Sequence, residues 1–351
     1  MKEKKIIDVC GYGHSGKGVL TDFFREFEGV TTHQHLFEFN LLRIQGGLLD
    51  LKHSIVDRWS PIRSSAALTR FETLIKRLGT NSKATKPGSW FTSTGNNYNS
   101  FFDNKFIELS EEYINQLIVF KTKKVWSFTK VEESGLKTFS NRLQNQLFPD
   151  RLEKSNFYLI DNKKFFDLTR AYLDELLSLS DGSGNPTIVT NNMIEPYNPD
   201  DSIKLFNDAR SIIIQRDPRD IYASLYVDPS LGYTPGYLKK SSIWKEKCSF
   251  LLADNITAFI EQQRISVDNI NSEDDSDKVL RLRVEDVILN YPDTQKLLYE
   301  FTGLSSAQHT KSQEFFKPNE SVKNIGLWKK LGEDSNVKRI EDELADLCYQ
   351  I

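Results

Sequence analysis

The chain has 351 residues, of which 38% are hydrophobic and 27% charged, so it can bury a sizeable core as one large domain or two small ones. Its net charge of -3 argues against a nucleic-acid partner, because proteins that coat DNA or RNA usually carry a basic balance. The three widely spaced cysteines, and the absence of any run near the ~18–20 apolar residues of a membrane span, predict a cytoplasmic protein with no transmembrane segment and no disulfide framework.

Strand-like and helix-like segments alternate along the chain, a pattern typical of an α/β fold with a central parallel sheet flanked by helices. The segment Ile6–Cys10 predicts a short buried strand, and apolar residues at helical spacing over 20–27 predict a helix directly after it. Further strands are expected at Thr187–Thr190, Ser211–Gln215 and Val279–Arg283. The last of these leads into a helix that ends near Gly303, and a final helix is expected over about 335–349.

The segment between the first two expected strands is long and mostly helical in pattern, at about 36–180. No internal repeat or low-complexity block separates it from the rest of the chain. We therefore expect a single domain over 1–351 that carries a large helical insertion.

A glycine-rich segment, GYGHSGK, occupies residues 11–17, directly after the first strand and before the first helix. Small residues allow consecutive backbone N–H groups to point into one concavity, and Lys17 adds a full positive charge. The next residue is Gly18, whereas kinases and nucleotide hydrolases place a Mg²⁺-binding Ser or Thr there. The sequence therefore predicts a phosphate-binding loop without the hydroxyl of an Mg²⁺ site.

A second anion-binding motif is expected at the end of the isoleucine-rich strand 211–215. Arg216 stands at the strand end, Asp217 and Pro218 are favoured residues for a helix start, and Ser224 lies about two turns into that helix. Arginine offers a planar fork of donors to a phosphate, and serine adds a hydroxyl. The alternative interpretation is local, with the acidic residues capping the helix and the arginines forming ordinary ion pairs.

Together, the two motifs resemble the 5′-phosphosulfate loop and the 3′-phosphate motif of sulfotransferases, in particular a bacterial branch that acts on carbohydrates. The segment LRLRVEDVILNYPDTQKLLYEFTGL at 280–304 and the stretch SVKNIGLWKK at 321–330 also resemble late elements of that family. The resemblance implies a P-loop-type α/β fold, the donor 3′-phosphoadenosine 5′-phosphosulfate, no metal ion, and a hydroxyl or amine acceptor of a polysaccharide or similar molecule. It also implies that the donor contacts Gly11, Gly13, His14, Ser15, Gly16, Lys17, Gly18, Arg216, Ser224 and Lys323.

Two positions depart from the family pattern. His14 stands where relatives usually carry Lys or Arg, so either Lys17 or a protonated His14 stabilises the leaving group. At 190–192, many relatives carry a lysine, whereas Asn191 and Asn192 are neutral and can offer an anion hydrogen-bond donors but no positive charge.

Sulfuryl transfer needs a general base that takes the proton of the attacking acceptor. The family places a His or Glu shortly after the first helix, which here points to Glu38, with His33 and His35 as alternatives. The competing function is a P-loop nucleotide kinase or NTPase, which would bind Mg²⁺ with ATP or GTP. A catalytically inactive homologue is a third interpretation, suggested by His14.

Overall fold

The computed structural model describes residues 4–32, 38–80, 97–124, 155–224, 253, 255–272 and 277–350. The chain consists of two compact units. Unit 1 comprises Met1–Asn40 and Ser183–Ile351, and unit 2 comprises Leu41–Gly182. Unit 1 contains both predicted phosphate-binding motifs, and unit 2 spans nearly the same residues as the expected insertion.

Unit 1 is built on a five-stranded sheet in the order β2-β5-β1-β6-β7, and every pair of neighbouring strands is parallel. This sheet confirms the predicted α/β fold and the four expected strands. The fifth strand, β2, was not predicted because it has only three half-buried residues. The strands are β1 (Lys5–Cys10), β2 (Val30–Thr32), β5 (Thr187–Asn191), β6 (Asp208–Gln215) and β7 (Val279–Arg283).

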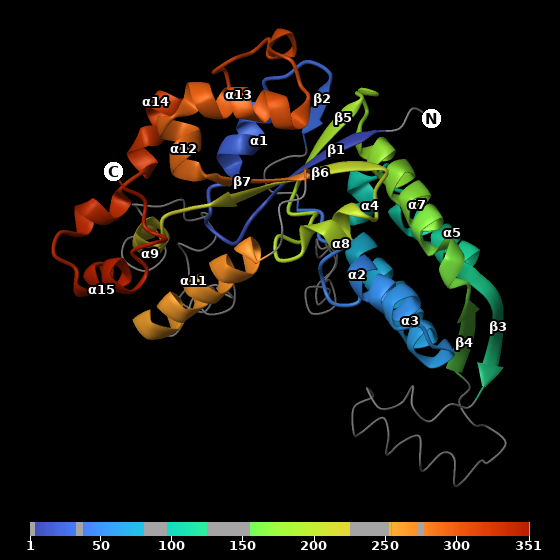
Figure 1. Ribbon diagram of the computed structural model, residues 1–351. Coiled ribbons are helices and arrows are strands. Elements are labelled where there is room, and N and C mark those ends of the chain that lie inside the picture. The colour runs from blue at the N-terminus through green and yellow to red at the C-terminus, as the bar shows by residue number, and fades with distance from the viewer. Residues whose placement is uncertain are drawn as a thin grey trace, which may run out of the picture. The chain divides into compact units, whose positions relative to one another are not determined.

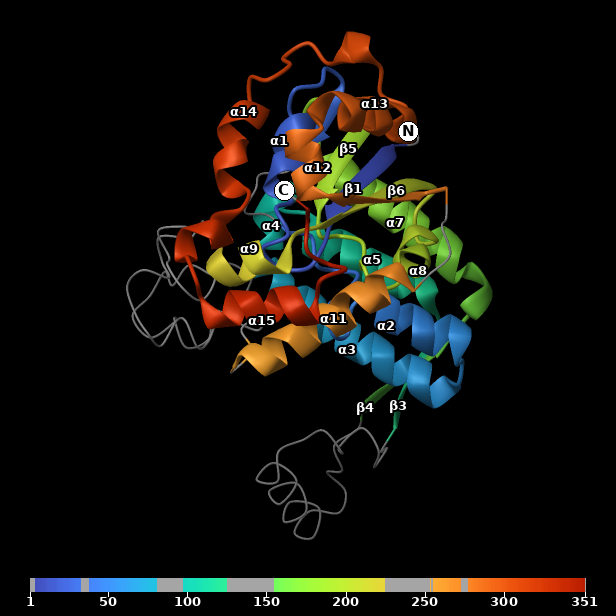
Figure 2. The ribbon, with the colours of Figure 1, turned by 60° about the vertical axis from the view of Figure 1, so that its left-hand side comes forward.

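Helices cover both faces of this sheet, because alternate residues of its central strands face opposite ways. In β6, Ile212 and Ile214 pack with apolar residues of α1 (Gly18–Phe24), α12 (Val284–Leu289) and α13 (Tyr291–Thr302). Ile213 packs instead with α9 (Pro218–Tyr222), α11 (Ile256–Asn271) and α15 (Ser335–Glu343). Figures 1 and 2 show these two helical layers on either side of the sheet.

The C-terminal part of unit 1 differs from the sequence expectations in two places. The helix expected after β7 is divided into α12 and α13, because Pro292 lies in the first turn of α13. Its expected end is confirmed at Gly303, which has a φ of +67°. The final helix ends at Glu343 and not near Tyr349. Beyond it, the backbone bonds instead to side chains at the carboxyl ends of β6 and β7, with Leu347 accepting from Arg283 and Tyr349 donating to Asp217. Two short helices, α8 (Pro199–Ile203) and α14 (Pro318–Ser321), also belong to the described part of unit 1.

Unit 2 contains helices together with a two-stranded antiparallel sheet that was not predicted. Its strands, β3 (Ile118–Lys124) and β4 (Ser155–Ile160), pack mainly through β4 against the longest helix, α3 (Pro61–Gly79). Buried hydroxyl groups join α5 (Phe106–Leu117) to α7 (Phe165–Ser180). Tyr113 bonds to Thr169 at 2.8 Å, and Ser110 bonds to Tyr172 at 2.7 Å. The α-helices among the described residues of the unit are α2 (Leu48–Lys52), α3, α4 (Tyr98–Phe101), α5 (Phe106–Leu117) and α7 (Phe165–Ser180).

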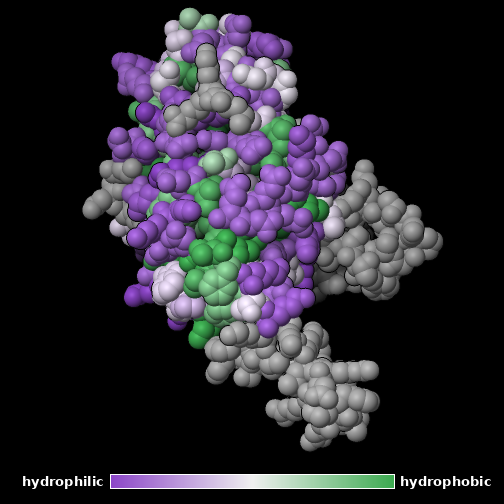
Figure 3. Space-filling model, turned by 90° about the vertical axis from the view of Figure 1, so that its right-hand side faces the viewer, coloured by the Kyte–Doolittle hydropathy of each residue, from purple (hydrophilic) through white to green (hydrophobic). Residues whose placement is uncertain are grey.

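Hydrophilic residues cover most of the face drawn in Figure 3, with smaller hydrophobic areas between them. None of the helices in the described part of the chain combines the length and the apolar composition needed to cross a bilayer.

Candidate phosphate-binding site

The predicted phosphate loop lies at the carboxyl edge of the unit 1 sheet. It follows β1, whose neighbours are β5 on one side and β6 on the other. After β1 the chain forms β2 and β5 on one side of β1, and it then crosses to form β6 and β7 on the other side. The loop after β1 therefore lies at a topological switch point. Open α/β sheets bind their ligands at such points.

Two glycines of the loop are required by close packing. A Cβ on Gly11 would lie 2.5 Å from the carbonyl oxygen of Ile214, at the end of neighbouring β6. Gly16 has a φ of +92°, and a Cβ there would lie 2.7 Å from Cγ2 of Val284. His14 also adopts a left-handed conformation, with a φ of +61°. The loop is therefore held in one tight shape against the end of β6 and the start of α12.

Ser15 gives the loop a buried polar atom that a ligand could satisfy. The residue is 1% exposed, and among the described residues its Oγ has no hydrogen-bond partner. Buried hydroxyls normally have a hydrogen-bond partner, so an unpaired hydroxyl inside a loop of this shape fits an anion that accepts a hydrogen bond from it. Gly13 lies within the same loop, Lys17 is the N-cap of α1, and Gly18 is its first residue.

Arg216 joins the second motif to this loop, as the sequence predicted for two motifs at one sheet edge. Its Nη1 donates to the carbonyl oxygen of His14 at 3.3 Å, and its Nη2 donates to that of Asn324 at 2.8 Å. The hydroxyl of Tyr12 donates to the carbonyl oxygen of Arg216 at 3.2 Å. Lys323 is exposed and precedes Asn324, so two cations come from segments that meet beside the loop.

The helix after Arg216 begins as its sequence predicts. The Asp217 side chain accepts from the backbone N–H of Arg219 at 2.8 Å, and Pro218 occupies the first turn of α9. Ser224 is 8% exposed, and its hydroxyl donates to the carbonyl oxygen of Asp220 at 2.7 Å. The hydroxyl must therefore rotate before it can donate to a phosphate.

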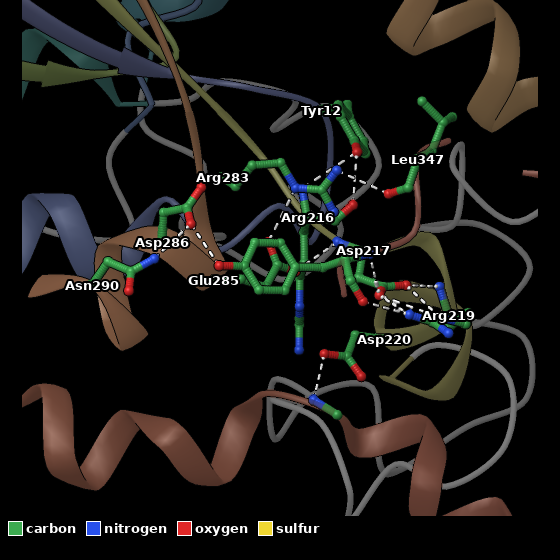
Figure 4. A network of polar contacts seen from close by, with 12 residues as sticks. Tyr12, Arg216, Asp217, Arg219, Asp220, Arg283, Glu285, Asp286, Asn290 and Leu347 are labelled. Atoms are coloured by element: carbon green, nitrogen blue, oxygen red, sulfur yellow. Dashed lines mark hydrogen bonds and ion pairs between the residues drawn. The ribbon is translucent and has the colours of Figure 1, made fainter. Parts of the chain in front are cut away.

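Arg219 belongs to a buried ion-pair network rather than to the anion site, as the local interpretation of the motif allowed (Figure 4). Its Nη2 lies 2.8 Å from the Asp217 carboxylate, and its Nη1 lies 2.9 Å from Glu341. Its guanidinium covers the Trp328 ring, with Cζ 4.2 Å from the ring centroid. Arg216 is thus the arginine of this motif that remains beside the loop.

Residues that were not predicted from the sequence fix the backbone around Arg216 (Figure 4). The backbone N–H of Asp217 donates to Glu285 at 2.7 Å, and Glu285 is fully buried next to Arg283. Burial raises the pKa of the Glu285 carboxyl, while the charge of Arg283 opposes that shift. The backbone N–H of Tyr349 donates to Asp217 at 2.9 Å. The Glu-Asp pair after β7 was the available sequence signal for this contact.

The charges around His14 help to decide whether His14 or Lys17 carries the positive charge of the loop. Desolvation lowers the pKa of His14, and the positive charges of Arg216 and Lys17 lower it further. At neutral pH the imidazole is therefore uncharged in the absence of a bound anion. This favours Lys17 over His14 as the permanent cation of the loop.

Glu38, the first choice for the base, lies beside the strand next to the loop. Its Oε1 accepts from Nδ2 of Asn192 at 2.7 Å, and Asn192 directly follows β5. Glu38 is exposed, so an acceptor can reach it from solvent. The alternative bases His33 and His35 lie outside the described residues.

The fold and the loop together define a parallel α/β protein with a candidate anion-binding loop at its switch point. No family model and no curated protein matches the sequence. Solved structures of sulfotransferases are similar to this chain. The sulfotransferase domain of the Synechococcus PCC 7002 olefin synthase is 11% identical, with 100% of this chain and 97% of that chain covered and a TM-score of 0.38.

The sulfotransferase domain from the curacin biosynthetic pathway is 12% identical over 100% of both chains, with a TM-score of 0.41. The sulfotransferase STF9 from Mycobacterium avium is 14% identical, with 98% of this chain and 76% of that chain covered and a TM-score of 0.36. Because these TM-scores lie below 0.5, the function is inferred from the residues of the site and not from the similarities.

Proposed function

We propose that this protein is a sulfotransferase that moves a sulfuryl group from 3′-phosphoadenosine 5′-phosphosulfate to a carbohydrate-like hydroxyl, or to an amine. The observation that carries the proposal is the contact between Arg216 and the carbonyl oxygen of His14, which brings the two phosphate motifs together. The loop with Ser15 and Lys17 would hold the 5′-phosphosulfate. Arg216, Ser224 and Lys323 would hold the 3′-phosphate, a group that ATP and GTP lack.

The transfer requires in-line attack by the acceptor oxygen on sulfur. A new oxygen–sulfur bond forms while the bond from sulfur to the 5′-phosphate oxygen breaks, and that oxygen leaves with the electron pair. Lys17 and the loop N–H groups would stabilise the negative charge that develops on the leaving oxygen. Fixed positive charge and backbone donors of this kind can supply that stabilisation without a metal ion.

Glu38 would accept the proton of the attacking hydroxyl. Its exposed carboxylate beside the strand end suits an acceptor that arrives from solvent, such as a polysaccharide. The sulfated acceptor and adenosine 3′,5′-bisphosphate are the products, and the proton passes from Glu38 to solvent to complete the turnover.

Calorimetric titration with adenosine 3′,5′-bisphosphate, in the absence of metal, tests the donor site directly. We expect binding by the wild type and about a tenfold or greater loss in Arg216→Ala, because one charged hydrogen bond is worth about 1.5–3 kcal/mol. Arg339→Ala is the matched control, since Arg339 forms an exposed pair with Glu343 in the same unit at 2.6 Å. Preferential binding of Mg·ATP would favour the kinase alternative and contradict the proposal.

Transfer is then measured with the ³⁵S-labelled donor and a panel of neutral and anionic glycans. We expect label to appear in a glycan with the wild type, and about 10²-fold less with Glu38→Gln, which keeps the shape but cannot accept the proton. Equal transfer by both proteins would remove Glu38 as the base.

A further inference from the structure

Asn192 occupies a strained position next to the proposed base. It is 6% exposed and has a φ of +56°, a left-handed conformation that few residues other than glycine and asparagine adopt readily. Its Nδ2 donates to Oε1 of Glu38 at 2.7 Å. The strained backbone thus presents a buried amide to one exposed carboxylate.

The backbone on both sides of Asn192 is tied to β1, the strand that carries the phosphate loop. The N–H of Asn192 donates to the carbonyl oxygen of Val9 at 3.0 Å. Asp8, fully buried in β1, accepts from the N–H groups of Met193 at 3.0 Å and Ile194 at 2.9 Å. One carboxylate therefore shapes the turn, and the strand that fixes the loop also fixes the amide.

The Asp8 carboxylate is itself held in place by a third donor. The hydroxyl of Thr190, on neighbouring β5, donates to its Oδ1 at 2.7 Å. A buried carboxylate with three donors is costly to disturb, so the turn has little freedom to move.

We infer that Asn192 is a positioning residue, which holds the Glu38 carboxylate at the edge of the phosphate loop so that it can take the proton of the acceptor. The inference rests on the proposed function. An amide suits this role because it orients Oε1 without adding charge, whereas a lysine would stabilise the carboxylate as an anion and weaken it as a base.

Substitution by glycine separates this role from a purely structural one. Asn192→Gly removes the amide but adopts a positive φ more easily than asparagine, so the fold should keep its stability. Asn192→Asp keeps the shape and places a second carboxylate beside Glu38, which favours the sharing of a proton between them. Asn104→Gly is the matched control, because Asn104 also has a positive φ, of +61°, and lies far along the chain from Glu38.

The assay follows the release of labelled inorganic sulfate from the ³⁵S donor, with water as the hydroxyl acceptor. We expect Asn192→Gly to bind adenosine 3′,5′-bisphosphate as the wild type does, and to lose about tenfold in rate, a fraction of the 10²–10⁴ that a general base contributes. We expect the acidic limb of the pH–rate profile to move to higher pH in Asn192→Asp, and Asn104→Gly to match the wild type.

An unchanged rate and pH profile in both Asn192 variants would overturn the inference and leave Asn192 as a turn residue, with the proposed function intact. A wild type that does not bind the bisphosphate would overturn the proposed function together with the inference. A wild type that is no faster than Glu38→Gln would overturn the inference and the role of Glu38 as the base.

Discussion

Replacement of Asp217 by asparagine tests how the backbone next to Arg216 is held. Asp217 is fully buried, and its two oxygens accept five hydrogen bonds. Oδ1 accepts from N and Nε of Arg219 at 2.8 and 3.1 Å. Oδ2 accepts from the same Nε at 3.2 Å, from Nη2 of Arg219 at 2.8 Å and from N of Tyr349 at 2.9 Å. An asparagine keeps one of these oxygens and turns an NH₂ group toward the donors of the other.

The expected cost follows from the bonds to the oxygen that is replaced. A hydrogen bond to a charged group contributes about 1.5–3 kcal/mol, and removing one partner of a buried pair costs about 3–5 kcal/mol. Arg219 keeps its contact with Glu341, whose side chain is 52% exposed, so part of its charge stays compensated. We therefore expect Asp217→Asn to lower the free energy of unfolding by about 3 kcal/mol, and to weaken bisphosphate binding because Arg216 is the preceding residue.

Urea unfolding followed by tryptophan fluorescence measures the loss, and Trp328, 4.2 Å from the Arg219 guanidinium, reports on this region. Asp334→Asn is the matched control. Asp334 also caps a helix, α15, by accepting from the N–H groups of Asn336 and Val337. Among the described residues it has no arginine partner, and asparagine caps a helix nearly as well as aspartate. A loss in Asp217→Asn no greater than that in Asp334→Asn would refute the ion-pair reasoning.

Three further predictions concern the loop and the C-terminal segment. Gly16→Ala places a Cβ 2.7 Å from a methyl group of Val284 at a φ of +92°, so we expect the free energy of unfolding, measured by thermal denaturation, to fall by about 1–3 kcal/mol. In the control Gly18→Ala the new Cβ meets open space, so the stability should not change. A bound phosphate should raise the lowered pKa of His14, so bisphosphate affinity should rise as the pH falls from 7 to 5, with proton uptake measurable by calorimetry in two buffers; a pH-independent affinity would contradict this. Tyr349→Phe loses a 2.5 Å hydrogen bond to Asp286 and should lower stability by about 1–2 kcal/mol in urea, and an unchanged midpoint would show that the bond contributes nothing.

The sheet of unit 1 could be predicted because its strands are short apolar runs with clear boundaries. Three consecutive isoleucines face alternate layers in β6, and Gly303 ends α13 with a positive φ. The helix start at Asp217 followed equally well from local capping preferences. In these segments, neighbouring residues alone decide the structure.

The contacts that hold the site together could not be predicted, because they join segments far apart in the sequence. The residues around Glu285 give no sign that its carboxylate accepts from the backbone N–H of Asp217. The residues around Tyr349 give no sign that its own N–H donates to the Asp217 side chain instead of to a helical carbonyl. The same holds for the buried Asp8, whose sequence position is that of an ordinary strand residue. Long-range polar contacts of this kind leave no periodic pattern to follow.

The partners of Arg216 have a consequence for how such sites vary between sequences. Both of its acceptors, at His14 and Asn324, are main-chain carbonyl oxygens, which every amino acid supplies. The orientation of the guanidinium therefore depends on the path of the backbone and not on the identity of those two side chains. Position 324 can change freely, and position 14 only within the residue types that tolerate a positive φ, while the arginine keeps its place. The same orientation of the arginine can therefore occur in proteins whose sequences share few residues.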